Sequence, residues 1–184
     1  MSIGEKFCYA ILELWALTVG GMNNMTDDEM KQSLLQKRTV EALKIFEEDM
    51  MPTDKEIAEE FFFEYMIKNM RLGSIDFDSV GRTGLKKSAG IEEHYSIIMD
   101  SDDAIGIVEV KYKAHENDLD KLDRKMKNFK KLFPWFKDYR QYGAIASFHI
   151  NESAKKAALS KGYFVLQRSG DVVHTESGEH LTVL

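Results

Sequence analysis

The sequence predicts an α/β fold, in which a mixed β-sheet is flanked by helices and preceded by an N-terminal helical extension. Three observations support this prediction: two helix-start motifs near the N-terminus, a series of short apolar runs bounded by turn residues, and helical patterns between the last of these runs. Strands that alternate with helices are typical of a sheet covered by helices. The 184 residues are enough for one domain with a substantial core and such an extension.

Two helices are predicted in the first part of the chain. Thr26-Asp27-Asp28-Glu29 and Thr53-Asp54-Lys55-Glu56 each place a glutamate three residues after a threonine, which is the capping-box pattern of a helix start. Apolar residues then recur at helical spacing, so we predict one helix over 27–49 and a second over about 53–70. Gly73 is expected to end the second helix.

The apolar stretch 7–22 could be mistaken for a targeting segment. It contains Glu13, lacks a small-residue cleavage site and is short for a membrane span. We therefore interpret it as an amphipathic helix and expect no membrane association, while Met22 and Met25 leave a later translation start open. The single cysteine, Cys8, excludes a disulfide framework and a cysteine-based zinc site, which fits a cytoplasmic location.

Three strands are predicted in the middle of the chain, over 75–80, 93–99 and 104–112. The segment 81–90 is polar, basic and contains glycine, so it is expected to be a loop. Asp100-Ser101-Asp102-Asp103 is expected to close a tight hairpin between the second and third strands.

The C-terminal half alternates helices and strands. A helix capped by Asn117 and Asp120 carries apolar residues at spacings of three and four and ends at Pro134. The remaining expected elements are a strand over 142–148, a helix over 151–161 ended by Gly162, a strand over 163–167 and a short hairpin-like tail.

The charge of the chain is unevenly distributed. The net charge of -6 argues against a protein that coats polyanions without specificity. Residues 104–162, in contrast, hold 13 Lys and Arg against 7 Asp and Glu. The helix near 118–131 supplies many of these lysines. We interpret its basic surface as a solvated face, with contacts to a nucleic-acid backbone as the alternative.

Glu109-Val110-Lys111 closes the apolar run 104–108. Alternate side chains of a strand share a face, so Glu109 and Lys111 are expected to point the same way and Val110 to point oppositely into the core. An acid and a base at the end of a buried strand are costly unless they bind something. A structural ion pair is the plainer interpretation, and an active site is the alternative.

The order of a helix, three strands, a helix and a strand, with an acid-x-Lys tripeptide ending the third strand, resembles the PD-(D/E)XK nuclease superfamily and its restriction-endonuclease-like fold. The resemblance covers about residues 57–170. It includes Ile107-Val108-Glu109-Val110-Lys111, Tyr142-Gly143-Ala144-Ile145-Ala146 and Gly162-Tyr163-Phe164-Val165-Leu166-Gln167. The likeness is strongest to uncharacterised bacterial members of that superfamily.

The resemblance implies a metal-dependent phosphodiesterase centre. Glu109, Glu59 and the Val110 carbonyl would ligate Mg²⁺ or Mn²⁺, which prefer hard oxygen ligands. Lys111 would orient the attacking water or stabilise developing charge. Glu60 is the alternative to Glu59 as the acid from the first core helix.

The chain departs from the family pattern on the preceding strand. The family usually has aspartate at the position that falls here on Ser96, and serine is a neutral, weak ligand for magnesium. Ser96 is therefore counted with the catalytic positions, but it is expected to weaken metal binding and hydrolysis. His94, Lys113 and Gln167 are expected at the rim of the site, where they could contact phosphate or, for His94, a metal.

Together these features predict a nuclease-like protein that hydrolyses phosphodiester bonds of nucleic acid, DNA foremost. The alternative is a catalytically degenerate member that binds nucleic acid or protein. We expect residues 1–52 to form the helical extension and residues 53–184 the nuclease-like domain. The extension is a candidate assembly module, which would make the protein a homodimer.

Overall fold

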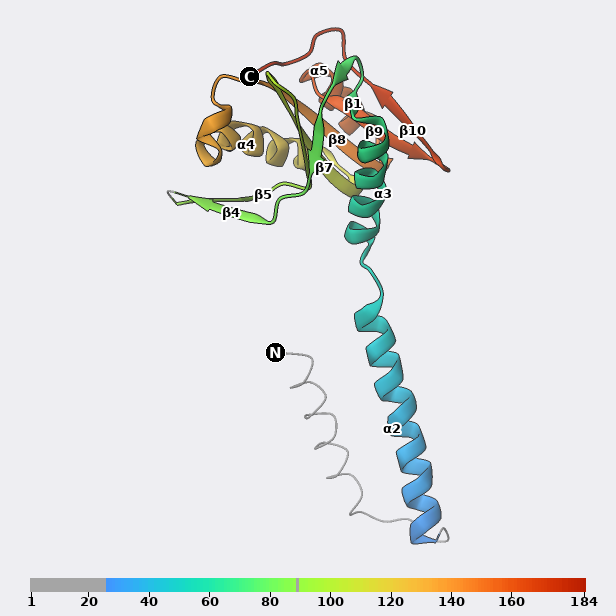
Figure 1. Cartoon of the computed structure of the whole chain (residues 1–184). Helices are drawn as coiled ribbons and strands as arrows, with labels where there is room; N and C mark the ends of the chain where they lie inside the picture. The colour runs from blue at the N-terminus through green and yellow to red at the C-terminus, as the bar shows by residue number, and fades with distance from the viewer. Residues whose placement is uncertain (1–25, 89) are drawn as a thin grey trace. The chain divides into compact units, whose positions relative to one another are not determined.

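The computed structural model describes residues 26–88 and 90–184 (Figure 1). The chain divides into two compact units, Met1–Met51 and Pro52–Leu184, and each is described by itself. The amphipathic helix expected over 7–22 lies outside the described residues, as do the alternative translation starts and Cys8. In the part that the structure describes, no helix is long and apolar enough to cross a bilayer.

The first unit contributes helix α2 (Asp27–Met50), which confirms the helix predicted over 27–49. Several large apolar side chains of α2 are exposed, among them Leu35, Val40 and Leu43.

The second unit consists of a mixed sheet, two small hairpins and helices on both sides (Figure 1). Its helical segments are α3 (Asp54–Asn69), α4 (Glu116–Leu132), the short 3-10 helix η2 (Pro134–Phe136) and α5 (Glu152–Ser160). Its strands are β1 (Arg71–Leu72), β2 (Ile75–Asp76), β3 (Ser79–Gly81), β4 (Leu85–Ser88), β5 (Ile91–His94), β6 (Ile97–Asp100), β7 (Ala104–Ala114), β8 (Arg140–Ile150), β9 (Phe164–Ser169) and β10 (Val172–Glu176).

Six strands form the main sheet in the order β10-β9-β8-β7-β6-β3. The central strands β7, β8 and β9 are parallel, and the outer neighbours pair antiparallel. The predicted mixed β-sheet flanked by helices is therefore confirmed. The expected hairpin after β6 is also present, since Ser101 N donates to Ala104 O at 2.9 Å.

Helices cover both faces of this sheet. On one face, Phe62 and Met66 of α3 pack with Val108 and Val110 of β7. On the other face, buried residues of α4 pack with Ile107 of the same strand and with residues of β8 and β9. Because β7 is covered on both sides, its sequence is a continuous apolar run, and any charged side chain within it must find a partner.

Helix α3 begins as its capping box predicts. The Thr53 hydroxyl accepts a hydrogen bond from Glu56 N, and the Glu56 carboxylate accepts from Thr53 N at 2.8 Å. The helix ends at Asn69, close to the predicted residue 70, but Met70 rather than Gly73 closes the last turn in a left-handed conformation with φ 50°. Gly73 lies instead in the turn between β1 and β2.

Three local predictions are corrected by the structure. The expected strand over 75–80 is split into β2 and β3, because Phe77 turns into the core and the chain changes partner from β1 to β6. The expected loop over 81–90 contains β4, which pairs with β5. The expected strand over 93–99 is interrupted at Tyr95 and Ser96, where the Tyr95 hydroxyl donates to the Lys125 carbonyl of α4 at 3.2 Å.

The cap of α4 also differs from the prediction. The N-cap is His115, whose backbone N–H donates to Asp118 Oδ2 at 3.0 Å, so the helix begins before Asn117 and Asp120. The cap of α5 is Asn151, and Gly162 follows that helix with φ 73°, as expected for a residue after a helix end.

Candidate active site

The Glu109 carboxylate is buried and is bound by two lysines. Glu109 is 3% exposed, its Oε1 lies 2.8 Å from Lys111 Nζ, and its Oε2 lies 2.6 Å from Lys125 Nζ. Lys111 comes from the same strand, whereas Lys125 reaches Glu109 from α4. A buried carboxylate without partners would be costly, so the two ammonium groups account for its tolerance in this strand.

The position of Glu109 follows from the alternation of β7. Ile105 and Ile107 face α4, so Glu109 and Lys111 point to the same face further along the strand. Val110 points to the opposite face, where it belongs to the core beneath α3. Glu109 lies in the middle of β7 and pairs with Ile145 of β8, and the strand continues to Ala114, so the tripeptide does not end its strand as predicted.

Ser96 immediately precedes β6 and binds a residue of α3. The antiparallel register pairs Ile97 with Val108, and continued one residue beyond β6 it would place Ser96 opposite Glu109. Ser96 is 4% exposed, and its hydroxyl donates to Glu59 Oε1 at 2.8 Å. The structure thus brings an acid from the first core helix to Ser96.

Lys111 is placed between several negative charges. Its Nζ lies 4.0 Å from Asp118 Oδ1 in addition to its contact with Glu109. Burial alone would lower the pKa of Lys111, but the charge and hydrogen bond of Glu109, together with the charges of Asp118 and Glu59, raise this pKa above its usual value. Lys111 is therefore a cation at neutral pH, and its side chain is 25% exposed.

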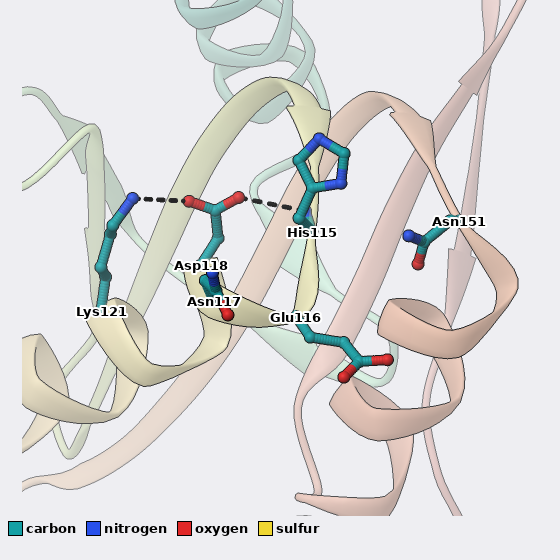
Figure 2. Close-up of a pocket in the computed structure, with 6 residues that line it drawn as sticks. All are labelled: His115, Glu116, Asn117, Asp118, Lys121 and Asn151. Carbon is teal, nitrogen blue, oxygen red and sulfur yellow. Dashed lines mark hydrogen bonds and ion pairs between the residues drawn. The ribbon is translucent and has the colours of Figure 1, made fainter.

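An open depression of about 510 Å³ borders this cluster at the start of α4 (Figure 2). Asp118 lies in its wall, where the carboxylate accepts from His115 N at 3.0 Å and from Lys121 Nζ at 3.0 Å. The depression is lined by His115, Glu116, Asn117, Asp118, Lys121 and Asn151. Asp118 also lies 4.0 Å from Lys111, so one residue of the lining contacts the Glu109 cluster.

The other predicted site residues occupy different places. Gln167 is in register with Lys111, two strands away across Ser147, so both side chains leave the same face of the sheet. Lys113 is exposed on β7. His94 lies in β5 opposite Leu85, outside the six-stranded sheet.

The alternative acid of α3 has another partner. Glu60 Oε2 lies 2.8 Å from Arg82 Nη2, and the Glu60 side chain is 60% exposed. The Asp100 carboxylate, on the strand before Glu109, accepts from the Ser79 hydroxyl at the opposite end of β6. Of Glu59, Glu60 and Asp100, Glu59 is therefore the acid that hydrogen-bonds to Ser96.

Two residues of the cluster were not identified as site residues from the sequence. The basic pattern of this helix predicts a solvated position for Lys125, but Lys125 is 7% exposed. Its neighbours Leu122 and Met126 are buried, which is the signal that could have assigned Lys125 to the inner side of the helix. Asp118 gave no such signal, because its role depends on the capping geometry at His115.

Some basic residues of α4 form ion pairs with acids, whereas others are exposed to solvent. Arg124 donates to both carboxylate oxygens of Glu93, at 2.8 and 3.0 Å, and Asn128 donates to Glu93 Oε1 at 2.9 Å. Lys127, in contrast, is exposed to solvent. The prediction of a solvated basic face therefore holds for part of the helix, while Lys125 and Arg124 are engaged by buried glutamates.

Comparisons with known proteins found little similarity. No family model matches the sequence, and no curated protein matches it. A structure of an EndoMS–dsDNA2 complex is similar to this chain with a TM-score of 0.44 and 15% sequence identity. The similarity covers 65% of this chain and 46% of that chain, so the match spans less than half of that protein. A similarity of this extent supports no conclusion about function.

Proposed function

We propose that this protein is a metal-dependent phosphodiesterase that acts on nucleic acid, with its centre at Glu109 and Lys111. One observation carries the proposal: buried Glu109 and Lys111 share one face of β7, and Ser96, in the next register position, binds Glu59 from α3. An acid and a lysine of β7 and an acid of α3 therefore approach the same part of the sheet. This constellation corresponds to the acid-x-Lys pattern of restriction-endonuclease-like nucleases that the sequence resembles.

The donor set fits magnesium in type and number. Magnesium is usually held by one or two carboxylates, water and substrate phosphate, and Glu109 and Glu59 are two such carboxylates. Zinc, in contrast, takes three or four protein ligands. Among residues 26–88 and 90–184, no group of three His, Cys, Asp or Glu side chains is arranged to hold a metal. We propose Glu109, Glu59 and the Val110 carbonyl as ligands of magnesium or manganese.

The chain's own residues would act on the phosphate through charge and position. A bound magnesium would polarise the phosphate and lower the pKa of a water. The ammonium of Lys111, which lies 2.8 Å from Glu109 Oε1, would donate hydrogen bonds to the negative charge that develops on the phosphoryl oxygens.

Two exposed lysines near the centre would contact phosphate groups of a substrate. Lys121, which pairs with Asp118 in the wall of the depression, is 52% exposed, and Lys113 is exposed on β7. Lysines at such positions bind phosphate groups without reading sequence. The preference for DNA over RNA rests on the family resemblance.

A second candidate function is binding of nucleic acid without hydrolysis. Ser96 favours it, because a neutral hydroxyl stands where the family usually has a carboxylate. In that case Ser96→Asp would create metal binding that the wild-type protein lacks, whereas the isosteric control Ser96→Asn would not. A wild-type protein that cleaves as fast as Ser96→Asp would contradict this second function.

The proposed activity is tested by nicking of supercoiled plasmid with magnesium or manganese. We expect nicking by the wild-type protein that chelator abolishes, and a loss of about 100-fold in Lys111→Met, because one charge-stabilising donor is removed. Lys137→Met is the matched control, since Lys137 is 73% exposed and pairs with Asp138. Equal nicking by Lys111→Met and Lys137→Met would contradict the proposed centre.

We also propose the domain division suggested by the sequence, with residues 1–52 as an extension and residues 53–184 as the nuclease-like domain. The homodimer through the extension stays a prediction. The mass of the full chain by light scattering tests it, and a monomer mass over a range of concentrations would contradict it.

A further inference from the structure

Lys125 differs from the other lysines of α4 by its burial and its fixed position. Its side chain is 9% exposed, and its ammonium lies 2.6 Å from Glu109 Oε2. Its backbone carbonyl accepts the Tyr95 hydroxyl at 3.2 Å, and its ammonium lies 5.9 Å from the centre of the Tyr95 ring. Tyr95 is itself buried against Phe129, so this part of α4 is held against the strand break beside Ser96.

Lys111 and Lys125 neutralise the same carboxylate from different surroundings. Lys111 is 25% exposed and has Asp118 as a second acid at 4.0 Å, so its side chain can turn away from Glu109 without losing all contact with a carboxylate. Within the described part of the chain, Glu109 is the acid that lies within ion-pair distance of Lys125. Movement of Lys125 would therefore break the ion pair that its buried ammonium makes with Glu109.

The ammonium of Lys125 lies next to Glu109 Oε2, which is a proposed metal-ligand atom. Magnesium binds carboxylate oxygen at about 2.0–2.1 Å, so a metal on Glu109 Oε2 would lie no more than about 4.7 Å from Lys125 Nζ. A monovalent and a divalent cation at that separation in a buried site repel each other strongly. Either the metal displaces Lys125, or the charge of Lys125 lowers the affinity of Glu109 for the metal.

We infer that Lys125 is a resident cation that competes with the divalent metal for Glu109, and this inference rests on the proposed metal-dependent function. Lys125 occupies Glu109 in the metal-free protein and lowers the affinity of the centre for metal. Removal of its charge leaves Glu109 paired with Lys111 alone, which has a second acid available, so the carboxylate becomes a better metal ligand.

Calorimetric titration of the full-length protein with Mn²⁺ tests the competition. We expect Lys125→Met and Lys125→Gln to bind Mn²⁺ at least about tenfold more tightly than the wild type, because the nearby positive charge is removed. The controls are Lys127→Met and Lys127→Gln, which remove the same charge from an exposed position of the same helix and should leave the affinity unchanged. The glutamine variant retains a polar side chain and provides the test if the methionine variant fails to fold.

The inference is overturned if the Lys125 variants bind Mn²⁺ no more tightly than the Lys127 variants. Plasmid nicking on the same samples separates this result from failure of the proposed function. Tighter binding in the Lys125 variants with no cleavage in any protein supports the competition and contradicts the phosphodiesterase. Cleavage by the wild type with unchanged metal affinity in the Lys125 variants contradicts the competition and supports the phosphodiesterase.

Discussion

Glu93 and Glu109 are both buried, and each forms an ion pair with one of two consecutive residues of α4. The chemistry of the two ion pairs differs. The two glutamates are 4% and 3% exposed, and their partners from α4 are Arg124 and Lys125. Glu93 accepts hydrogen bonds from the Nε and Nη2 atoms of the Arg124 guanidinium and a third from Asn128. Glu109 accepts from two ammonium groups instead.

The difference distinguishes a structural carboxylate from a candidate reactive one. A guanidinium forms a planar fork that matches a carboxylate, and the resulting pair has fixed geometry. An ammonium is a compact charge on a flexible stem, and a metal or a phosphate can replace or attract it more readily. Glu93 therefore links α4 to β5 through a pair of fixed geometry. Glu109, in contrast, binds two lysine ammonium groups that a metal or a phosphate could displace.

The largest stability difference is expected between Glu109→Ala and Glu93→Ala. Removal of Glu109 leaves the ammonium of Lys125 buried without an acid, which should lower the free energy of unfolding by about 3–5 kcal/mol. Removal of Glu93 should cost about 1–3 kcal/mol, because Arg124 is 60% exposed and can be hydrated. Urea unfolding followed by circular dichroism measures both values. A larger loss in Glu93→Ala would contradict the contrast between the two sites.

A smaller effect is expected when Ser96 is replaced. Ser96→Asp adds a buried carboxylate beside Glu59 and Glu109, and repulsion between like charges should lower the melting temperature by roughly 5 °C in chelator. Mn²⁺ should restore more stability in this variant than in Ser96→Asn, which has the same shape without the charge. Thermal melts with and without Mn²⁺ provide the measurement, and equal restoration in the two variants would argue against a metal site beside Ser96.

The smallest effect concerns acid stability. The hydrogen bond from Arg124, opposed by burial and assisted by Asn128, holds the pKa of Glu93 below its ordinary value of 4.5. A carboxyl whose folded pKa is lowered stabilises the protein above its unfolded pKa, and this contribution is lost as the pH falls through the folded value. Glu93→Gln should therefore lose less stability than the wild type between neutral pH and pH values below 4.5. Melting temperatures across this range test the sign, and a steeper loss in Glu93→Gln would be inconsistent with it.

The regular elements of the second unit could be predicted because their patterns are local. The capping box at Thr53 and the apolar run before Glu109 each have a direct structural counterpart. The strand predicted over 75–80 is divided in the structure because Phe77 enters the core. Strand β4 was not predicted, because Leu85 is exposed and the segment lacks the alternation of buried and exposed residues that indicates a strand. These departures depend on tertiary partners that periodicity does not encode.

The candidate site shows the same limit. The sharing of a face by Glu109 and Lys111 follows from strand geometry, and the structure reproduces it at 2.8 Å. The approach of Lys125 to Glu109 depends on how α4 lies across the sheet, which the spacing of its apolar residues does not determine. The contact between Ser96 and Glu59 likewise joins residues from two elements and required the fold.

The cleavage rate of a DNA substrate under single-turnover conditions with Mg²⁺ tests the central claim most directly. Glu109→Gln and Glu93→Gln each remove the charge of one buried glutamate, and only the first removes a proposed metal ligand. We expect Glu109→Gln to cleave at least about 100-fold more slowly than the wild type, while Glu93→Gln remains close to the wild-type rate. Equal rates in the two variants, or no metal-dependent cleavage by the wild type, would contradict the assignment of the reaction centre to Glu109.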